Sequence, residues 1–477
     1  MAKNLMIMGT MSSAGKSFIV TGLCRLFSRM GYKVAPFKSQ NMALNSFVTE
    51  EGLEMGRAQV VQAEACGKRP SVNMNPILLK PSSDVGSQVI VNGKPIGNMK
   101  ADEYYNYKPR LIPEIMSAYD KLAKENDIII IEGAGSPAEI NLKENDIVNM
   151  GMAKLVDAPV LLVGDIDLGG VFAQLIGTLV LLDEDETARI KGLVINKFRG
   201  DVSLLEPGIR QLEEKADKNV LGVVPMVKAN IEQEDSVTSA FKSEAMSGKV
   251  DVAVIRLPYI SNFTDFEVLK LNKNANVRFV EKASDFGEPD LIILPGTKST
   301  IADLRWLKDS GLAEEITKCQ GAPIIGICGG YQMLGEMVCD PDEVETGGCE
   351  EGLGLLAHST TLCKEKTTKQ VTGRFTGLTG DFESLNGLEY EGYEIHNGQT
   401  TLTDGTSREN TFGTYIHGVF DKGKIASVLI NKLMKSCEGE KTEESDYCDY
   451  KMKQYDAIAD AMEGAFDIHK LKEIIGL

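Results

Sequence analysis

The feature that most constrains the fold is a glycine-rich segment near the start of the chain, GTMSSAGKS at residues 9–17. It follows the apolar run Leu5–Met8, a predicted strand, and it precedes the predicted helix Ser17–Met30. Glycines let backbone N–H groups come close to phosphate, and a helix N-terminus adds positive potential. This order of strand, loop and helix predicts a phosphate-binding loop in an α/β unit.

Individual residues of this loop have separate expected functions. Gly9 and Gly15 shape the backbone, Lys16 can neutralise the β- and γ-phosphates of ATP, and Ser17 can ligate Mg²⁺. The spacing departs from the usual GxxxxGK[ST], because Thr10 stands where the first glycine belongs and Gly9 lies one residue earlier. A plain Gly/Ser turn with an incidental lysine is the alternative interpretation. The strand and helix on either side favour the phosphate loop.

Two polar residues in the same half follow predicted strands. Glu132 ends a buried apolar run beside the expected nucleotide crevice, where an acid is placed to make a second Mg²⁺ contact. The alternative is a carboxylate that only caps a loop. Asn196 follows another such run and, with Lys197, could bind the nucleotide base. The alternative there is a plain surface turn.

Apolar runs separated by segments of helix length predict a parallel sheet covered on both faces, and hence an α/β doubly wound fold. A polar stretch at 228–250 marks a domain junction, after which a second α/β series begins. We therefore predict a synthetase domain at 1–235, a second doubly wound domain at 251–437 and a solvated C-terminal tail at 438–477. The predicted strands are Leu5–Met8, Val34–Phe37, Ile128–Ile131, Val160–Val163, Gly192–Ile195, Gly222–Val224, Asp251–Leu257, Leu291–Leu294, Pro323–Ile327 and Gly413–Phe420.

In the second half, Cys328 stands between a predicted strand and a segment with helix-like apolar spacing. Gly326, Gly329 and Gly330 flank it and permit a tight, strained turn that projects the side chain outward. Backbone N–H groups at such a turn favour the thiolate and help to stabilise an oxyanion. We therefore predict that Cys328 is a nucleophile, and that the other eight cysteines are inert core residues.

A thiol nucleophile needs a base, and the chain has four histidines. His417 is the predicted base because it ends a predicted strand, Gly413–Phe420, in the same domain. His396 is the weaker candidate and could line the site, while His469 lies near the C-terminus and is expected on the surface. His358 completes the set. Gly296 follows another predicted strand and offers N–H groups for the second half of an oxyanion hole.

Composition limits the partners and the compartment. The chain has 69 acidic and 51 basic residues and a net charge of −18, which argues against nucleic acid or an anionic membrane as partner. The N-terminal segment is too short for a signal peptide, and the apolar runs are too short to span a membrane. Nine cysteines without a CxxC pair favour a reduced cytoplasm over a disulfide framework, and four histidines argue against zinc.

Several motifs resemble known families over almost the whole chain. GICGGYQMLG at 326–335 and YIHG at 415–418 resemble class I glutamine amidotransferases of the cobyric acid synthase branch. The amino-terminal half resembles the dethiobiotin-synthetase-like P-loop family. The segments at 38–46, 75–81, 132–142 and 260–266 are the most specific, and they resemble the family of glutamine-hydrolysing cobyric acid synthases.

This resemblance implies ATP- and glutamine-dependent amidation of four carboxylates of adenosylcobyrinic acid a,c-diamide. It also implies that Cys328 attacks glutamine, that His417 shuttles protons, and that Gly296 and Gly329 stabilise the oxyanion. Mg-ATP would be held by the loop and by Glu132. Lys38 and Asp146 would lie near the γ-phosphate and the corrin substrate. Glutamine and a corrinoid are the expected partners, in a possible homo-oligomer.

One departure from the wider amidotransferase pattern concerns the histidine. Many class I enzymes carry His-Pro-Glu, whereas Gly418 and Val419 follow His417 here. The resemblance therefore points to a Cys–His dyad and leaves open what fixes the imidazole tautomer. Three alternatives stay open: cobyrinic acid a,c-diamide synthase, a P-loop partitioning ATPase without amide chemistry, and a degenerate binding protein. The intact Lys16 and Cys328 argue against the last.

Overall fold

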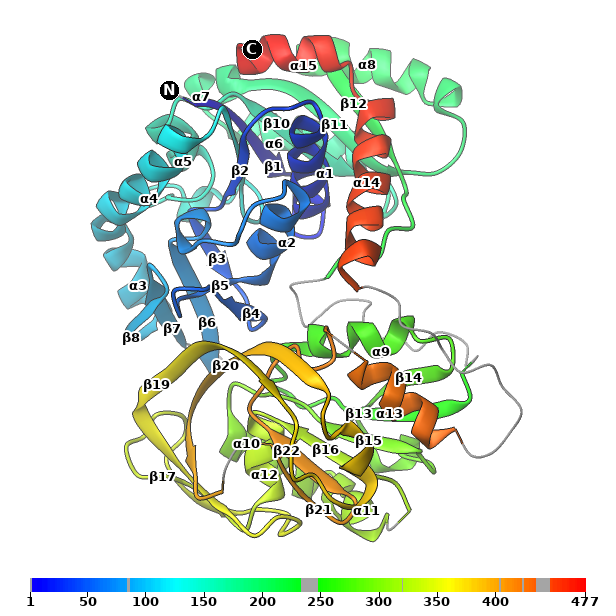
Figure 1. Ribbon diagram of the computed structural model, residues 1–477. Helices are drawn as coiled ribbons and strands as arrows, with labels where there is room; N and C mark the ends of the chain where they lie inside the picture. The colour runs from blue at the N-terminus through cyan, green and yellow to red at the C-terminus, as the bar shows by residue number, and fades with distance from the viewer. Residues whose placement is uncertain are drawn as a thin grey trace. The chain divides into compact units, whose positions relative to one another are not determined.

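The computed structural model describes residues 2–83, 86–232, 248–319, 321–402, 405–422, 424–434 and 447–477. The chain forms two compact units (Figure 1). The first unit comprises Met1–Met42, Met55–Ile231 and Tyr450–Leu477, and the second comprises Ala43–Glu54 and Glu232–Asp449. This division differs from the predicted one because each unit takes in a segment from a distant part of the chain.

The first unit is built on a parallel sheet of six strands in the order β12-β11-β10-β1-β9-β2. All six strands predicted for this half are present, and their apolar runs are buried. The strands of this sheet are β1 Lys3–Gly9, β2 Val34–Phe37, β9 Ile128–Glu132, β10 Val160–Asp165, β11 Ile190–Phe198 and β12 Val220–Pro225. Because parallel strands point the same way, the segments after β1, β2, β9 and β11 all leave the same edge of the sheet.

Helices and a smaller sheet complete this unit. The smaller sheet has the order β3-β6-β7-β8, with the pairs β6–β7 and β7–β8 antiparallel. Its strands are β3 Gln40–Met42, β6 Ile77–Ser83, β7 Gly86–Val91 and β8 Lys94–Lys100. The helices are α1 Lys16–Arg29, α2 Arg57–Ala65, α3 Ala101–Tyr107, α4 Ile112–Glu125, α5 Met150–Leu155, α6 Val171–Leu181, α7 Glu184–Arg189, α8 Glu206–Ala216, α14 Tyr447–Ala465 and α15 Ile468–Ile475.

The C-terminal helices are part of the first unit's core, which corrects the expectation of a solvated tail. α14, drawn in red, lies beside α1, drawn in dark blue (Figure 1). Ile458 and Met462 on α14 and Phe466 directly after it recur at intervals of four and form one apolar face, which is buried in the same cluster as residues of α1. Arg25 on α1 also pairs with Asp456 on α14 at 2.8 Å. The part of the predicted tail before Tyr447 lies outside the described residues.

The second unit contains another mainly parallel sheet, in the order β14-β13-β15-β16-β22-β21, with β21 antiparallel at the edge. The predicted class of two α/β units is thereby confirmed. A further sheet, β18-β17-β19-β20, was not predicted. The strands are β13 Val250–Ile255, β14 Ala275–Val280, β15 Leu291–Leu294, β16 Ile324–Ile327, β17 Met337–Asp340, β18 Gly348–Glu351, β19 Ser359–Arg374, β20 Glu389–Thr400, β21 Thr406–Arg408 and β22 Thr411–Thr414.

The helices of this unit are short and join its strands. They are α9 Glu267–Leu271, α10 Thr300–Asp309, α11 Leu312–Lys318, α12 Gly329–Leu334 and α13 Ile425–Leu433. The strand expected at Gly413–Phe420 is wrong in its extent, because β22 ends at Thr414. His417 therefore lies beyond the end of β22, where it forms an isolated bridge with Tyr393.

A segment of the amino-terminal half, 43–54, is built into the second unit. It includes β4 Ser46–Val48 and the first residue of β5 Glu54–Gly56. Val48 packs with Tyr393 and Ile395 of β20 in one buried cluster. Glu54 pairs with Lys366 at 2.6 Å, although 312 residues separate them. Nothing in the composition of this segment marks it as belonging to the other unit.

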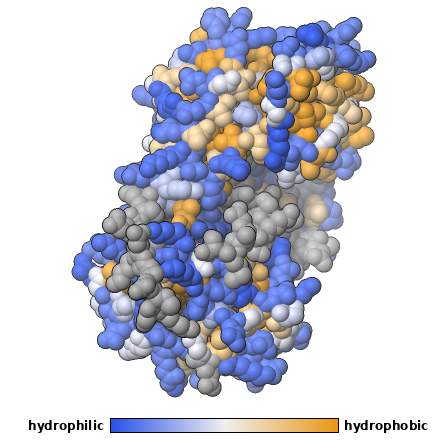
Figure 2. Space-filling view, turned by 90° about the vertical axis from the view of Figure 1, so that its right-hand side faces the viewer, coloured by the Kyte–Doolittle hydropathy of each residue, from blue (hydrophilic) through white to orange (hydrophobic). Residues whose placement is uncertain are grey.

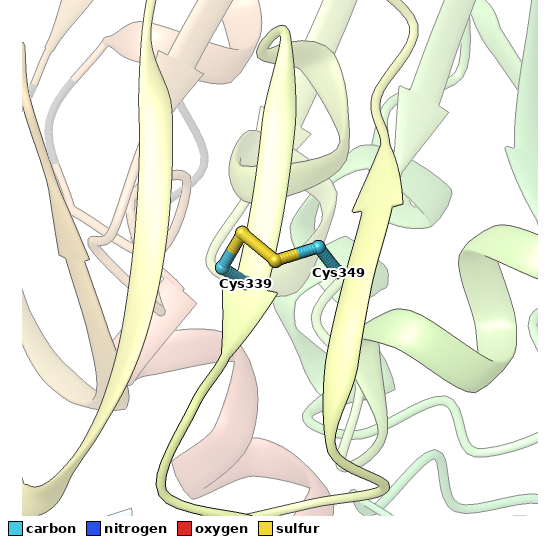
Figure 3. Close-up of a disulfide and its surroundings, with 2 residues drawn as sticks. All are labelled: Cys339 and Cys349. Carbon is cyan, nitrogen blue, oxygen red and sulfur yellow. A yellow bond between two sulfur atoms is a disulfide. The ribbon is translucent and has the colours of Figure 1, made fainter.

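Two cysteines form a disulfide that the sequence analysis did not predict. Cys339 on β17 and Cys349 on β18 face each other across an antiparallel pair and are bonded (Figure 3). The acidic segment 340–351 thus comprises the end of β17, the connection between the two strands and β18. Cys363 is only partly buried and Cys448 is exposed, so the expectation that all other cysteines lie in the core is also wrong. Cys437 lies outside the described residues.

One face of the molecule is mainly hydrophilic (Figure 2). Figure 2 shows one face of the molecule, on which blue residues predominate and orange hydrophobic residues gather on the unit that contains α14. The first unit exposes several large apolar side chains, among them Leu168, Val180 and Leu204. Within the described ranges, each helix is too short or too polar to cross a bilayer.

Candidate active site

The glycine-rich loop leads from β1 into α1 in the predicted manner. Gly15 precedes the helix with φ 94°, a left-handed conformation that favours glycine. A Cβ at this position would also lie 2.1 Å from the Asn196 amide nitrogen. Lys16 is buried, and its Nζ donates to the carbonyl oxygens of Met11 and Gly135 at 3.0 Å each. The Lys16 side chain therefore folds back over the glycine-rich loop, where it is expected to bind the phosphates of ATP.

Glu132 collects three polar partners at the end of β9. Its Oε1 accepts from Ser17 Oγ at 2.9 Å and from Lys38 Nζ at 2.8 Å, while Oε2 accepts from Gln62 Nε2 at 2.5 Å. Burial raises the pKa of this carboxyl, but the Lys38 charge and the hydrogen bonds from Lys38, Gln62 and Ser17 outweigh it and lower the pKa below its ordinary value. The group is therefore a carboxylate at neutral pH.

The Ser17 and Glu132 oxygens suit Mg²⁺. Two neighbouring ligands of an octahedral ion with bonds of about 2.0–2.1 Å lie about 2.9 Å apart. Ser17 Oγ and Glu132 Oε1 are separated by 2.9 Å. A hydroxyl and a carboxylate are also the hard donors that this ion prefers, with phosphate oxygens and water completing its shell. The residues present thus fit the metal predicted from the sequence.

Asn196 and Lys197 hold the glycine-rich loop. Asn196 Nδ2 donates to Ala14 O at 2.9 Å, and Lys197 Nζ donates to Ser13 O at 2.8 Å and to Asp165 at 2.6 Å. Beyond them, a cavity of about 580 Å³ opens past the ends of β11 and β12. Its lining is largely apolar and includes Phe198, Pro225, Met226 and Ala465. This volume is typical of a small-molecule pocket.

Asp146 has a structural function that the sequence analysis missed. Its carboxylate accepts three backbone N–H groups, those of Val148, Asn149 and Gly151, at 2.8–2.9 Å. These bonds fix the start of α5. Asn149 in turn bonds both the N–H and the carbonyl of Ala134, in the loop after Glu132. Asn149 was not predicted, because a lone asparagine outside a motif carries no distinct signal.

Cys328 stands at the predicted strained turn, between β16 and α12. Its φ of 53° and ψ of −108° are unusual for a residue other than glycine. The neighbouring backbone is tightly packed, since a Cβ at Gly330 would lie 2.0 Å from Leu294 O. The thiol is nearly buried, and its Sγ lies 3.7 Å from Ile395 O on β20. Figure 1 places α12 beside β16 and β22 in the same unit.

The two glycines expected to form the oxyanion hole lie close to this turn. A Cβ at Gly329 would lie 3.1 Å from Thr297 N, and a Cβ at Gly296 would lie 2.8 Å from His417 Cε1. The loop that carries Gly296 is held by Asp303, whose carboxylate accepts from Thr297 Oγ1. Burial raises the pKa of Asp303 to about 7. This residue was not predicted.

His417 is the histidine that the fold brings to Cys328. Its Nδ1 lies 2.7 Å from Asp265 Oδ2, and both side chains are almost fully buried. Burial lowers the pKa of the imidazole, but the Asp265 carboxylate and a hydrogen bond with Cys328 raise it to about 10. Asp265 was not predicted as a site residue, although it lies in the 260–266 motif that supported the family resemblance.

The other histidines are placed elsewhere. His396 bonds Gly398 O at 2.8 Å and lies 3.3 Å from Glu394, with its ring stacked on Tyr415. His358 is buried against Tyr331, and neither ring nitrogen has a hydrogen-bond partner among the described residues. His469 is exposed on α15. The geometry therefore favours His417 as the base.

Comparisons with known proteins agree with this arrangement. Residues 5–238 match the family described as the CobQ/CobB/MinD/ParA nucleotide binding domain. Residues 251–425 match the CobB/CobQ-like glutamine amidotransferase domain.

Relatives match the chain over its full length. The protein named cobyric acid synthase from Lachnoclostridium phytofermentans is 53% identical, over 100% of this chain and 99% of the relative. That from Ruminiclostridium cellulolyticum is 52% identical, over 100% and 97%. That from Caldanaerobacter subterraneus subsp. tengcongensis is 50% identical, over 100% and 99%. The chain therefore belongs to the cobyric acid synthase family.

Proposed function

We propose that the protein uses ATP and glutamine to amidate the b, d, e and g carboxylates of adenosylcobyrinic acid a,c-diamide, giving adenosylcobyric acid in cobalamin biosynthesis. Three observations support this proposal: the family membership, the Mg-ATP donor set around Glu132, and the Cys328–His417 pair. The observation that carries it is Cys328 in its strained turn with a buried imidazole as partner. A structural cysteine needs neither feature.

Glutamine hydrolysis follows from that pair. The Cys328 thiolate attacks the side-chain amide carbon, and the N–H groups near Gly296 and Gly329 bind the oxyanion that forms. The His417 imidazolium then protonates the departing nitrogen, so that ammonia leaves and a thioester remains. The neutral imidazole next takes a proton from water as that water attacks the thioester. Glutamate leaves and the thiolate returns.

Carboxylate activation is assigned to the first unit. An oxygen of the corrin carboxylate attacks the γ-phosphorus of ATP, ADP leaves, and an acyl phosphate forms. Ammonia then attacks the acyl carbon, and phosphate leaves with the C–O electron pair. Lys16 and Lys38 neutralise the phosphate charge during transfer. Ser17 and Glu132 would hold Mg²⁺, which would supply charge neutralisation at the phosphates.

The remaining nucleotide contacts are also proposals. Asn196 and Lys197 keep the phosphate loop in shape, and the apolar cavity beyond them accepts the adenine ring. Asp146 near the corrin substrate stays a prediction, and its bonds to backbone N–H groups would hold the loop there. The expected homo-oligomer and the cytoplasmic location stay predictions.

A product assay tests the proposal. Purified protein is incubated with adenosylcobyrinic acid a,c-diamide, Mg-ATP and glutamine, and the corrinoid mass is followed beside the Cys328→Ala variant. We expect stepwise conversion of four acids to amides, lost in the variant and restored by free ammonia. An unchanged corrinoid despite turnover of ATP and glutamine would contradict the proposed acceptor. Amidation of cobyrinic acid at the a and c positions would instead identify the protein as a cobyrinic acid a,c-diamide synthase.

A further inference from the structure

We propose that Asp265 is the positioning residue of the glutamine-hydrolysing site and completes a Cys328–His417–Asp265 triad. Gly418 and Val419 follow His417, so the sequence lacks the glutamate of the His-Pro-Glu pattern there. Asp265 supplies the missing carboxylate from a distant segment of the chain. The inference rests on the proposed function, because it assigns His417 the proton transfers of glutamine hydrolysis. It adds a residue that acts through the imidazole and does not touch the substrate.

The contact between Asp265 and His417 has the geometry of a charge-assisted hydrogen bond. Nδ1 and Oδ2 are 2.7 Å apart, and both groups are sealed from water. Since the carboxylate is acceptor-only, Nδ1 must carry the hydrogen. The ring nitrogen left for Cys328 is therefore Nε2, which accepts or donates the proton in each half of the reaction. The carboxylate thus sets the tautomer as well as the ring orientation.

Asp265 is itself fixed from two sides. Its second oxygen, Oδ1, accepts the backbone N–H of Gly418 at 3.0 Å. Gly418 has φ 72°, so this N–H reaches the carboxylate through a left-handed conformation that favours glycine. Asp265 lies in the 3₁₀ turn Phe263–Phe266, and its own N–H donates to Asn262 O at 3.0 Å. Gly418 thus helps to hold the Asp265 carboxylate in place. In class I enzymes with His-Pro-Glu, the glutamate two residues after the histidine supplies the corresponding carboxylate.

A tyrosine stacks on the same imidazole. The rings of Tyr393 and His417 are 5.5 Å apart and inclined by 25°. Their backbones exchange two hydrogen bonds, of 3.1 and 2.9 Å. In the described part of the chain, the titratable groups that face the imidazole are Asp265, Cys328 and Tyr393. Asp265 is the carboxylate among them, so the negative charge that stabilises an imidazolium comes from this residue.

Asp265→Asn tests the inference, because it keeps the shape of the side chain and removes its charge. We expect kcat for glutamine hydrolysis to fall on the order of 10²- to 10⁴-fold, with little change in KM. The alkaline limb of the kcat/KM profile should also move to lower pH, since the imidazole loses the carboxylate that raises its pKa to about 10. A residue that only supports the fold would not move this limb.

A second measurement follows the thiol directly. Iodoacetamide alkylates Cys328 as the thiolate, and the pH dependence of this rate, followed by mass on the peptide that carries Cys328, reports the Cys328–His417 pair without any turnover. Asp265→Asn should shift this dependence, whereas Asp251→Asn should not. Asp251 is a matched control in the same unit, where it pairs with Arg278 at 2.9 Å and lies outside the site. Melting curves of both variants show whether the fold survives.

The outcomes separate this inference from the proposed function. If the wild type hydrolyses glutamine and Cys328→Ala does not, the nucleophile assignment stands whatever the Asp265 variant does. A folded Asp265→Asn protein with wild-type kcat and an unshifted pH profile would overturn the triad. Loss of activity with both pH dependences unshifted would overturn it as well, since the residue would then be only structural. Ammonia-dependent amidation should stay intact in this variant.

Discussion

Both candidate sites rest on a buried carboxylate, but the two carboxylates are held differently. Glu132 is contacted by three side chains, those of Ser17, Lys38 and Gln62. Asp265 is contacted by one imidazole and by a backbone N–H. Side chains can change rotamer when a ligand arrives, whereas a backbone N–H cannot leave without moving the chain.

This difference matches the chemistry proposed for each site. Glu132 must offer its oxygens to a metal ion, and its pairing with Lys38 is one that a bound Mg-ATP would rearrange. Asp265 must keep one imidazole in one tautomer through a complete cycle, so a fixed acceptor serves it better. A buried carboxylate held by side chains thus suits exchange, while one anchored to the backbone suits orientation.

The largest expected effect separates the two sites. Lys16→Ala should reduce ammonia-dependent amidation by roughly 10³-fold or more, because the phosphate charge loses its buried cation. Cys328→Ala should leave the same ammonia-dependent reaction intact. Product mass with ammonium chloride in place of glutamine measures both. Lys191→Ala is the control, since Lys191 is exposed and lies outside the loop. Equal losses in Lys16→Ala and Cys328→Ala would show that the two sites do not act separately.

A smaller effect is expected at the exchangeable carboxylate. Glu132→Gln should lower ammonia-dependent amidation on the order of 10²-fold, and added Mg²⁺ should recover part of it because a weaker ligand set fills at higher metal concentration. The alkaline limb of the kcat/KM profile for glutamine hydrolysis should lie at the same pH in Glu132→Gln as in the wild type. Titration of Mg²⁺ at fixed ATP measures the first effect. A loss that Mg²⁺ does not relieve would argue against Glu132 as a metal ligand.

Several residues of the candidate nucleotide site could be singled out from the sequence because they lie at strand ends. Glu132 and Asn196 each follow an apolar run, and parallel strands bring such ends to one edge of the sheet. Lys38 was expected near the γ-phosphate only through the family resemblance, which did not specify its contact with Glu132. Gln62 was missed because it lies within α2, where its buried amide gives no sequence signal.

The amidotransferase site was predicted only in part. Cys328 and its glycines form a local motif, and the strained turn is present. Asp265 lies 152 residues before His417, so no local spacing connects them. The segment 43–54 was missed for the same reason, since its place in the second unit depends on pairs such as Glu54 with Lys366. Long-range pairing is decided by tertiary packing, which a single sequence does not display.

The pH dependence of stability gives a sharper test of the fixed carboxylate. The pKa of His417 is raised from 6.5 to about 10 in the folded protein. Its pairing with Asp265 therefore stabilises the folded state fully at pH values below 6.5, and this stabilisation is lost as the pH rises through about 10. Asp265→Asn should therefore destabilise the second unit by about 2 kcal/mol at pH 6, as expected for loss of a hydrogen bond between charged groups, and by much less near pH 10.5. Urea unfolding at both pH values measures this. An equal loss at both would contradict a charge-based role.

The smallest effect is expected from removal of the Tyr393 hydroxyl. The ring of Tyr393 stacks on His417, and its hydroxyl contacts the segment 43–54. It donates to Ser46 O at 3.0 Å and accepts from Asn262 Nδ2 at 2.7 Å. Tyr393→Phe keeps the ring on the imidazole but removes both bonds, at a cost of about 1 kcal/mol. For a unit of this size, the temperature at which glutamine hydrolysis is lost should fall by about 2–4 °C.

The control for this change lies in the other unit. Tyr119→Phe also removes a hydroxyl bond, the one to Asn4 Oδ1 at 2.7 Å, but it should leave the heat inactivation of glutamine hydrolysis unchanged. Asn262 still donates to Ser46 O at 2.9 Å in the Tyr393 variant, which limits the expected loss. If Tyr393→Phe instead lowered kcat as far as Asp265→Asn does, the hydroxyl would share in orienting His417. The orientation of His417 would then depend on the segment 43–54 as well as on the fixed carboxylate of Asp265.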